Sequence, residues 1–212
     1  MNNTGRKSLI GFILFIIVLP VLSVLSSKFG LDKNRQLKRE VNQLNYPIKA
    51  QNLVAANQNN QTKSLVQLMR GRVSIVGTFD INCPTIECQE GIKQLLRVQH
   101  EYSDDLDKFQ ILSFTSLAPT DKPEKLLHFA QKNTIDSTKW QLFNLSAEAL
   151  NSFIADNKIQ KNHVLLLDTS LVIKNTYNVT NLKEVNKLME HIAIIAPKKA
   201  KARIEYQASK PI

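Results

Sequence analysis

The hydrophobic pattern of the chain begins with an apolar run near the N-terminus. Residues 8–27 form twenty consecutive positions without a charge. A helix of that length rises about 1.5 Å per residue and reaches about 30 Å, the thickness of the hydrocarbon core of a bilayer. A buried helix of a globular domain would show a polar face, and this run shows none. We therefore predict a transmembrane anchor over 8–27, preceded by a short tail over 1–7.

A cleaved signal peptide is the alternative interpretation of this run. Its apolar region would be shorter, and a site of the Ala-x-Ala type would follow it. Residues 21–27 contain serines but no alanine, which favours an uncleaved anchor. Pro20 lies inside the run, where a membrane-spanning helix tolerates a kink.

A polar and charged connection over residues 28–46 follows the apolar run. Leu31, Leu37 and Val41 recur there at a loose helical spacing, which predicts a short stalk or linker. Further along, the polar stretch 58–62 separates two apolar stretches and indicates a β-hairpin.

The remaining pattern alternates between strands and helices. Such alternation is typical of βαβ units and predicts an α/β fold. We expect one domain over 47–196 and a basic, flexible tail over 197–212. The predicted strands span 73–79, 109–115, 164–168 and 171–177, and the predicted helices span 86–102, 122–132, 147–154 and 181–195.

The net charge of +10 is concentrated at the two ends of the chain. Residues 1–45 carry a net charge of +5, residues 197–212 carry +4, and the middle of the chain carries only +1. A nucleic-acid-binding domain would carry its charge on the folded surface, so no nucleic-acid partner is expected. The basic ends instead suggest contact with an anionic membrane surface.

Candidate chemistry lies at the chain's two cysteines, Cys83 and Cys88. Two are too few for a disulfide scaffold or an all-cysteine zinc site. They fall where the first strand of the βαβ unit gives way to its helix, and reactive groups of α/β proteins gather at such strand ends. The positive end of the helix dipole lowers the pKa of a thiol there and favours thiolate. Two small apolar residues packed without a function are the alternative.

Three segments, in order, resemble the Sco/SenC family of thioredoxin-like proteins over about residues 45–195. The first is Gly71–Leu95, which contains an apolar strand and Cys-Pro at a helix start. The second is Ser116–Leu126, followed by Trp140–Phe143 where the family has a W-x-x-L pattern. The third is His163–Asp168, which precedes the last predicted strand.

The resemblance implies a thioredoxin-like fold, with a central mixed sheet flanked by helices, behind an N-terminal transmembrane helix. It also implies a copper site made of Cys83, Cys88 and His163, because soft thiolates select Cu(I) and an added imidazole accommodates Cu(II). The family's activities are copper delivery to cytochrome c oxidase and thiol–disulfide reduction. The expected partners are therefore the membrane and a cytochrome c oxidase subunit or a periplasmic redox or copper partner.

Two features depart from the family pattern. Four residues separate Cys83 from Cys88, where the family has three. Positions five apart in a regular helix differ by about 140°, so a loop or a bulge would have to bring the pair together. His163 lies five residues before Asp168, closer than the family's histidine, and Gln160 falls nearer to the family position. A copper ligand and an ordinary strand-end histidine both remain open for His163.

Three other histidines fall on predicted helices, where we expect them to be solvated or at the edge of the core: His100, His128 and His191.

Three functions remain open. The first is a copper-binding assembly factor, favoured over an enzyme. The second is a membrane-tethered thiol–disulfide oxidoreductase that uses Cys83 and Cys88. The third is a thioredoxin-like module that only binds a partner. The basic residues after the anchor would place the domain in the cytoplasm by the positive-inside rule. A redox or copper pair suits an oxidising compartment better, so we expect a single-pass protein whose domain faces the periplasm.

Overall fold

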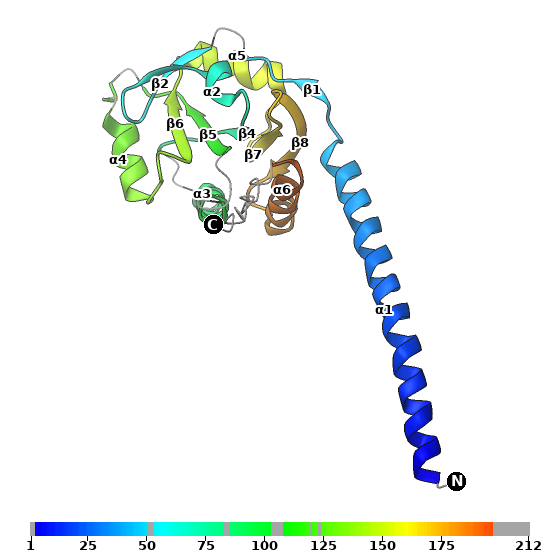
Figure 1. Cartoon of the computed structure of the whole chain (residues 1–212). Helices are drawn as coiled ribbons and strands as arrows, with labels where there is room; N and C mark the ends of the chain where they lie inside the picture. The colour runs from blue at the N-terminus through cyan, green and yellow to red at the C-terminus, as the bar shows by residue number, and fades with distance from the viewer. Residues whose placement is uncertain are drawn as a thin grey trace, which may run out of the picture. The chain divides into compact units, whose positions relative to one another are not determined.

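The computed structural model of the chain is shown in Figure 1. It describes residues 3–50, 53–82, 85–102, 108–118, 120–122 and 124–196, with the α1 side chains described from residue 18 onward except residue 24. Cys83 and the predicted tail 197–212 lie outside the described residues. The chain divides into two compact units, Met1–Asn42 and Gln43–Ile212.

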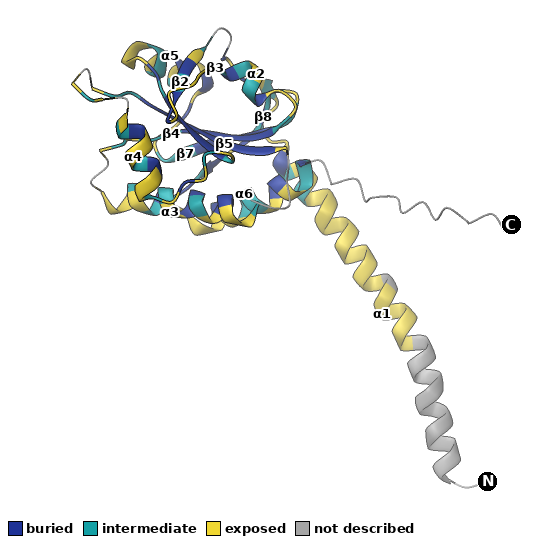
Figure 2. Ribbon diagram, turned by 60° about the vertical axis from the view of Figure 1, so that its left-hand side comes forward, coloured by how far each residue is buried: buried dark blue, intermediate teal, exposed yellow. Residues whose placement is uncertain are grey.

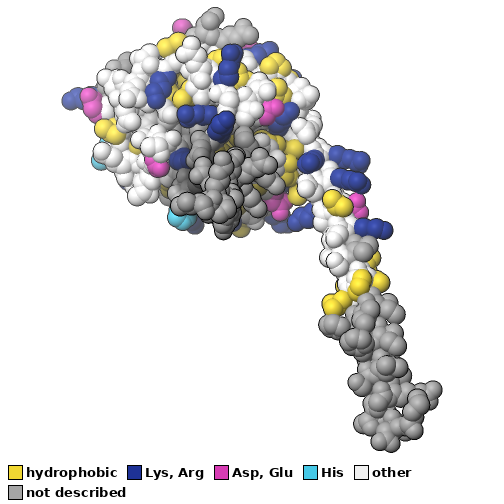
Figure 3. Space-filling view, in the orientation of Figure 1, with side chains coloured by type: hydrophobic (Ala, Val, Ile, Leu, Met, Phe, Trp, Pro, Cys, Tyr) yellow, Lys and Arg dark blue, Asp and Glu magenta, His cyan; other side chains and the backbone are white. Residues whose placement is uncertain are grey.

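The first unit is dominated by helix α1, Asn3–Val41, which joins the predicted anchor and most of the predicted stalk in one helix. Pro20 lies inside it. Figure 3 shows Lys and Arg side chains gathered on the C-terminal part of α1. In the part of the chain whose side chains are described, no helix is long and apolar enough to cross a membrane. The predicted anchor, 8–27, falls in large part outside that region.

The second unit is built from strands and helices that alternate as predicted. The described strands are β1 Tyr46–Pro47, β2 Val54–Asn57, β3 Thr62–Ser64, β4 Val73–Thr78, β5 Phe109–Thr115, β6 Trp140–Asn144, β7 His163–Leu167 and β8 Val172–Asn178. The described helices are α2 Leu65–Met69, α3 Ile86–Glu101, α4 Glu124–Lys132, α5 Ala147–Asn157 and α6 Leu182–Ile195.

These strands form a mixed sheet in the order β1-β8-β7-β4-β5-β6-β2-β3. β4, β5 and β6 run parallel, whereas β7 is antiparallel to β4 and β8 is antiparallel to β7. Helices α3 and α6 cover one face, and α2 and α5 cover the other (Figures 1 and 2). The prediction of an α/β fold with a central mixed sheet flanked by helices is confirmed.

The central strands are buried on both faces, as expected for parallel strands between two helical layers. In β4, the first five residues are buried, and all seven residues of β5 are buried. On the α2 and α5 side, Leu65 and Phe153 pack with Phe114 in the core.

The predicted hairpin is confirmed, but strands β1 and β6 and the short helix α2 were not predicted. β2 and β3 pair antiparallel around the polar turn, with Ala55 opposite Lys63. The hairpin joins the sheet through β6, which the pattern did not indicate as a strand. Gln58 extends this join. Its side-chain Oε1 accepts a hydrogen bond from Leu142 N at 2.8 Å, and its backbone N–H donates to Leu142 O at 3.0 Å.

Candidate functional site

Helix α3 begins between the two cysteine positions, and its start determines where Cys88 lies. Thr85 is the N-cap residue, with extended backbone angles of φ −89° and ψ 147°, and Ile86 is the first helical residue. The Thr85 side-chain oxygen accepts a hydrogen bond from Cys88 N at 3.4 Å, as expected for a capping threonine. Cys88 therefore lies in the first turn, and the helix begins at Ile86, three positions after Cys83 in the sequence.

Cys88 is half-buried and disulfide-bonded. The chain contains two cysteines, and the other, Cys83, lies with Pro84 outside the described residues. The described Cys88 is thus in its oxidised form, at the positive end of a helix dipole, where a released thiol would favour thiolate.

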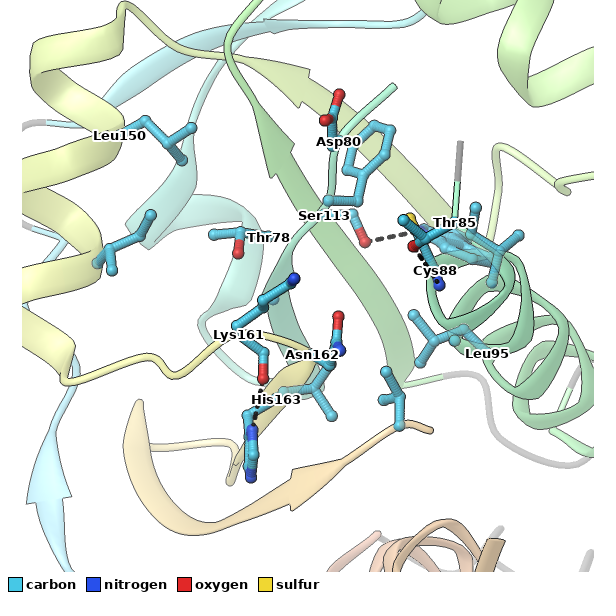
Figure 4. A pocket seen from close by; sticks show the side chains of 18 of the residues that line it. Thr78, Asp80, Thr85, Cys88, Leu95, Ser113, Leu150, Lys161, Asn162 and His163 are labelled. Carbon is cyan, nitrogen blue, oxygen red and sulfur yellow. Dashed lines mark hydrogen bonds between the residues drawn. The ribbon is translucent and has the colours of Figure 1, made fainter. Parts of the chain in front are cut away.

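A pocket of about 350 Å³ opens beside Cys88 (Figure 4). Its walls include the end of β4, the first turns of α3 and the chain entering β7, and further residues come from β5, β6, α4 and α5. Lys161, Asn162 and His163 line it together with Cys88. Its apolar walls include Phe79, Leu95, Phe129, Trp140, Leu150 and Ile154.

The sheet topology explains why Cys88 and His163 line one pocket despite their separation in sequence. β7 is antiparallel to β4, and Val164 pairs with Gly77. The start of β7 therefore lies beside the end of β4, where the chain leads into the cysteine segment. The resemblance predicted that these two residues share a site, and the structure brings them to the same cavity.

The orientation of His163 is less suited to a shared metal site. Its Nδ1–H donates a hydrogen bond to the Lys161 carbonyl oxygen at 2.8 Å. Because Nδ1 carries the proton, Nε2 keeps its lone pair and is the atom available to a metal. Metal-binding histidines commonly have this arrangement. Figure 4 shows the imidazole pointing away from Cys88, so in this form of the protein the ring is not placed as a partner ligand.

The copper site inferred from the resemblance fits the structure in part. Two thiolates and an imidazole are the right donor types for copper. Among the residues that the structure describes, no group of three or more His, Cys, Asp or Glu side chains could hold a metal ion. The predicted set includes Cys83, which lies outside those residues.

The segment before Cys83 is held by side-chain contacts that sequence reasoning missed. Asn82 N donates to Asp80 Oδ1 at 2.8 Å, which closes a tight turn. Lys125 Nζ, on α4, donates to Asn82 Oδ1 at 2.6 Å and to both carboxylate oxygens of Asp121 at 2.9 Å. The Lys125 hydrogen bond lowers the pKa of the Asp121 carboxyl group. The spacing of Asp121 and Lys125 could have revealed their ion pair, but nothing local indicates Asn82 as a partner.

Two buried polar pairs lie in and near the same region. Trp140 Nε1 donates to Ser113 Oγ at 2.9 Å, and both residues line the pocket. His191, expected at the surface or the edge of the core, is instead fully buried, with its Nδ1 2.5 Å from the Tyr177 hydroxyl oxygen. His100 and His128 are exposed, as expected.

Comparison with known proteins supports the fold. No family model matches the chain, and no curated protein matches its sequence. A SCO1/SenC family lipoprotein from Bacillus anthracis is 20% identical with a TM-score of 0.60, over 71% of this chain and 96% of that one. BsSco, described as a cytochrome c oxidase assembly protein with a disulfide switch, is 18% identical with a TM-score of 0.58, over 72% and 94% of the two chains.

The thiol–disulfide class is also represented among the similar structures. A putative protein disulfide isomerase from Bacteroides thetaiotaomicron is 16% identical with a TM-score of 0.53, over 72% of this chain and 93% of that one. At these identities the likenesses establish the fold. The chain is an α/β protein of the thioredoxin-like fold, and the expected resemblance to Sco/SenC proteins is confirmed at that level.

Proposed function

We propose that this chain is a membrane-anchored, Sco/SenC-like protein that binds copper through Cys83 and Cys88 for delivery in cytochrome c oxidase assembly. The pair cycles between a disulfide and a dithiol, and the dithiol form takes up the metal. The observation that carries the proposal is the disulfide-bonded Cys88, in the first turn of α3 and beside the pocket that also holds His163.

The chemistry of the pair follows from its two states. Reduction of the disulfide by a dithiol donor consumes two electrons and two protons and yields two protein thiols, while the donor becomes a disulfide. Uptake of Cu(I) then releases protons, because the thiolate is the ligand. Cu(I) needs little more than two soft thiolates, whereas Cu(II) depends on an added imidazole. His163 is the residue proposed for that role once its ring turns toward the pair.

The proposed organisation places each segment in relation to a membrane. Residues 1–7 stay inside, 8–27 span the bilayer, 28–46 form a stalk, 47–196 form the domain, and 197–212 form a basic tail. The uncharged run supports the anchor, since its length matches the bilayer core. We propose that the domain faces the periplasm, where cysteine pairs are oxidised and reduced in normal function.

A thiol–disulfide oxidoreductase is the second candidate. The direction of the His163 imidazole, away from Cys88, favours a site that exchanges disulfides without copper. The likeness to a putative disulfide isomerase supports the same class. The two candidates share Cys83 and Cys88 and differ in whether metal binds.

A copper titration of the reduced full chain in detergent micelles separates these functions. The assembly-factor proposal predicts uptake of one Cu(I) per chain, and a Cys83→Ala, Cys88→Ala double variant is the matched control that should bind none. Reversible oxidation without copper uptake by the wild type would contradict copper delivery and leave the oxidoreductase. Failure to bind copper together with failure to re-form the disulfide would contradict both and favour a module that only binds a partner.

A further inference from the structure

Lys125 connects helix α4 to the segment that leads into Cys83, across 43 residues of sequence. Its ammonium group lies 2.6 Å from Asn82 Oδ1, and Asn82 immediately precedes Cys83. Asn82 also belongs to a tight turn, because its backbone N–H donates a hydrogen bond to Asp80 Oδ1. Holding Asn82 from both sides restricts the backbone at the point where it enters the cysteine pair.

Lys125 is itself held in place by Asp121. The two carboxylate oxygens each lie 2.9 Å from Lys125 Nζ, and Asp121 Oδ2 also accepts a hydrogen bond from Ala118 N at 3.2 Å. The side chains of Lys125 and Asp121 are 32% and 19% exposed, so the pair is partly shielded from water. A lysine fixed in this way loses little further freedom when it bonds to Asn82.

We propose that Lys125 is a positioning residue for the cysteine pair, which holds the Asp80–Asn82 turn through Asn82 in the geometry that favours the disulfide. This role rests on the proposed function of Cys83 and Cys88. Restraining the chain before Cys83 leaves fewer conformations open to it, and closing the disulfide with Cys88 then costs less conformational entropy. The structure, with Cys88 oxidised and Asn82 bonded to Lys125, contains both halves of this arrangement.

The opposite effect would follow if Lys125 acted only through its charge. A nearby ammonium group stabilises thiolate and so favours the reduced pair. Removing the charge would then make the disulfide harder to reduce, whereas removing the restraint makes it easier to reduce. Asn82→Ala removes the restraint but keeps the Lys125 charge beside Asp121, so the two mechanisms are separable.

The test is the equilibrium between the full chain in detergent micelles and mixtures of reduced and oxidised dithiothreitol. In this exchange the protein disulfide opens to two thiols while dithiothreitol closes to its cyclic disulfide, so electrons and protons balance. Asn82→Ala and Lys125→Met should each lower the ratio of oxidised to reduced protein about three- to tenfold. Lys125→Arg retains the charge and the donors and should restore the ratio to within about twofold of wild type.

Lys132→Met is the matched control, because Lys132 is an exposed lysine on the same helix, and it should leave the ratio unchanged. Urea unfolding of each oxidised variant verifies that the domain is folded. An unchanged ratio of oxidised to reduced protein in Asn82→Ala, or a raised ratio in Lys125→Met, overturns the positioning role. The proposed function still stands in that case if the wild-type cysteine pair is oxidised and reduced reversibly. A wild-type pair that dithiothreitol cannot open overturns both.

Discussion

Gly77 in β4 lies against Val164 in β7 so closely that a Cβ atom at Gly77 would come 2.8 Å from Val164 Cγ1. Gly77 pairs with Val164 in the sheet, and both residues line the pocket beside Cys88. The missing side chain thus allows the start of β7, with His163, to approach the end of β4. The contact between these strands is a condition for the site's geometry.

Gly77→Ala should therefore destabilise the domain by about 1–3 kcal/mol through overpacking. Val164→Ala removes the methyl group that would clash, so the double variant should be more stable than the sum of the two single effects predicts. Urea unfolding of the four proteins measures this coupling. Gly91→Ala in α3 is the matched control, since its Cβ would lie 3.1 Å from Val179 Cγ2 and alanine favours a helix, and it should cost less. Additive single effects would contradict the clash.

Ser113→Ala should destabilise the domain by about 1–3 kcal/mol, because it leaves the buried Trp140 N–H without its acceptor. Trp140 is the chain's single tryptophan, so its fluorescence reports directly on the pocket wall. We expect a shifted emission maximum in the variant, measured alongside urea unfolding. Ser146→Ala, at the exposed N-cap of α5, provides a comparison in which stability falls but the emission maximum stays as in the wild type.

His163→Ala should spare most Cu(I) binding, because the two thiolates supply most of the affinity. It should remove the Cu(II)–thiolate absorption band, which depends on the imidazole. Cys83→Ala or Cys88→Ala should abolish Cu(I) binding, since one thiolate remains. Absorption spectra and Cu(I) titrations of the three variants measure both effects. If Cu(II) still binds unchanged in His163→Ala, the third ligand is another residue.

Tyr102 should make the domain sensitive to alkali. Burial, and then the nearby Glu101 carboxylate, raise the pKa of Tyr102 to about 12, and its hydroxyl donates to the Met189 carbonyl oxygen at 2.5 Å. An unfolded tyrosine ionises near pH 10. Between about pH 10 and 12 the unfolded chain therefore loses this proton first, and the free energy of unfolding falls as the pH rises.

Tyr102→Phe should remove that part of the alkaline decline while costing about 1 kcal/mol at neutral pH through the lost hydrogen bond. Urea unfolding of both proteins at pH 8, 10 and 11 measures how steeply the free energy of unfolding falls with pH. Groups other than Tyr102 titrate alike in the two proteins, so their contribution drops out of the difference between the two slopes. Parallel pH profiles for wild type and variant would show that Tyr102 does not titrate differently on folding.

The proposed membrane topology predicts the behaviour of C-terminal reporters. An alkaline phosphatase fused after Ile212 should be active, and a reporter that works only in the cytosol should be inactive at the same position. The short N-terminal segment with Arg6 and Lys7 is easily retained inside, in spite of the basic stalk. The reverse pattern of reporter activities would place the domain in the cytoplasm and end the periplasmic proposal.

The sequence by itself determined the elements whose signals are local. The runs that became β4 and β5 are rich in apolar residues, because both faces of a central strand are buried, and such runs can be recognised without knowing which strands they pair with. The predicted helix 147–154 begins where α5 begins, and the Ser146 side chain caps it by accepting a hydrogen bond from Ala149 N. The sequence also determined that Cys83 and Cys88 follow a strand and accompany the start of a helix, because both neighbouring elements have local signals.

Only the tertiary structure decided the features that depend on residues far apart in the chain. β6 is a strand because it pairs with β5 and with the hairpin, although its own sequence alternates weakly. His163 reaches the Cys88 pocket through the antiparallel pairing of β7 with β4, but its ring direction is determined by Lys161. The Lys125–Asn82 contact spans 43 residues, and hydrogen bonds of that range leave no periodic trace in a sequence, because periodicity records only which face of an element is buried.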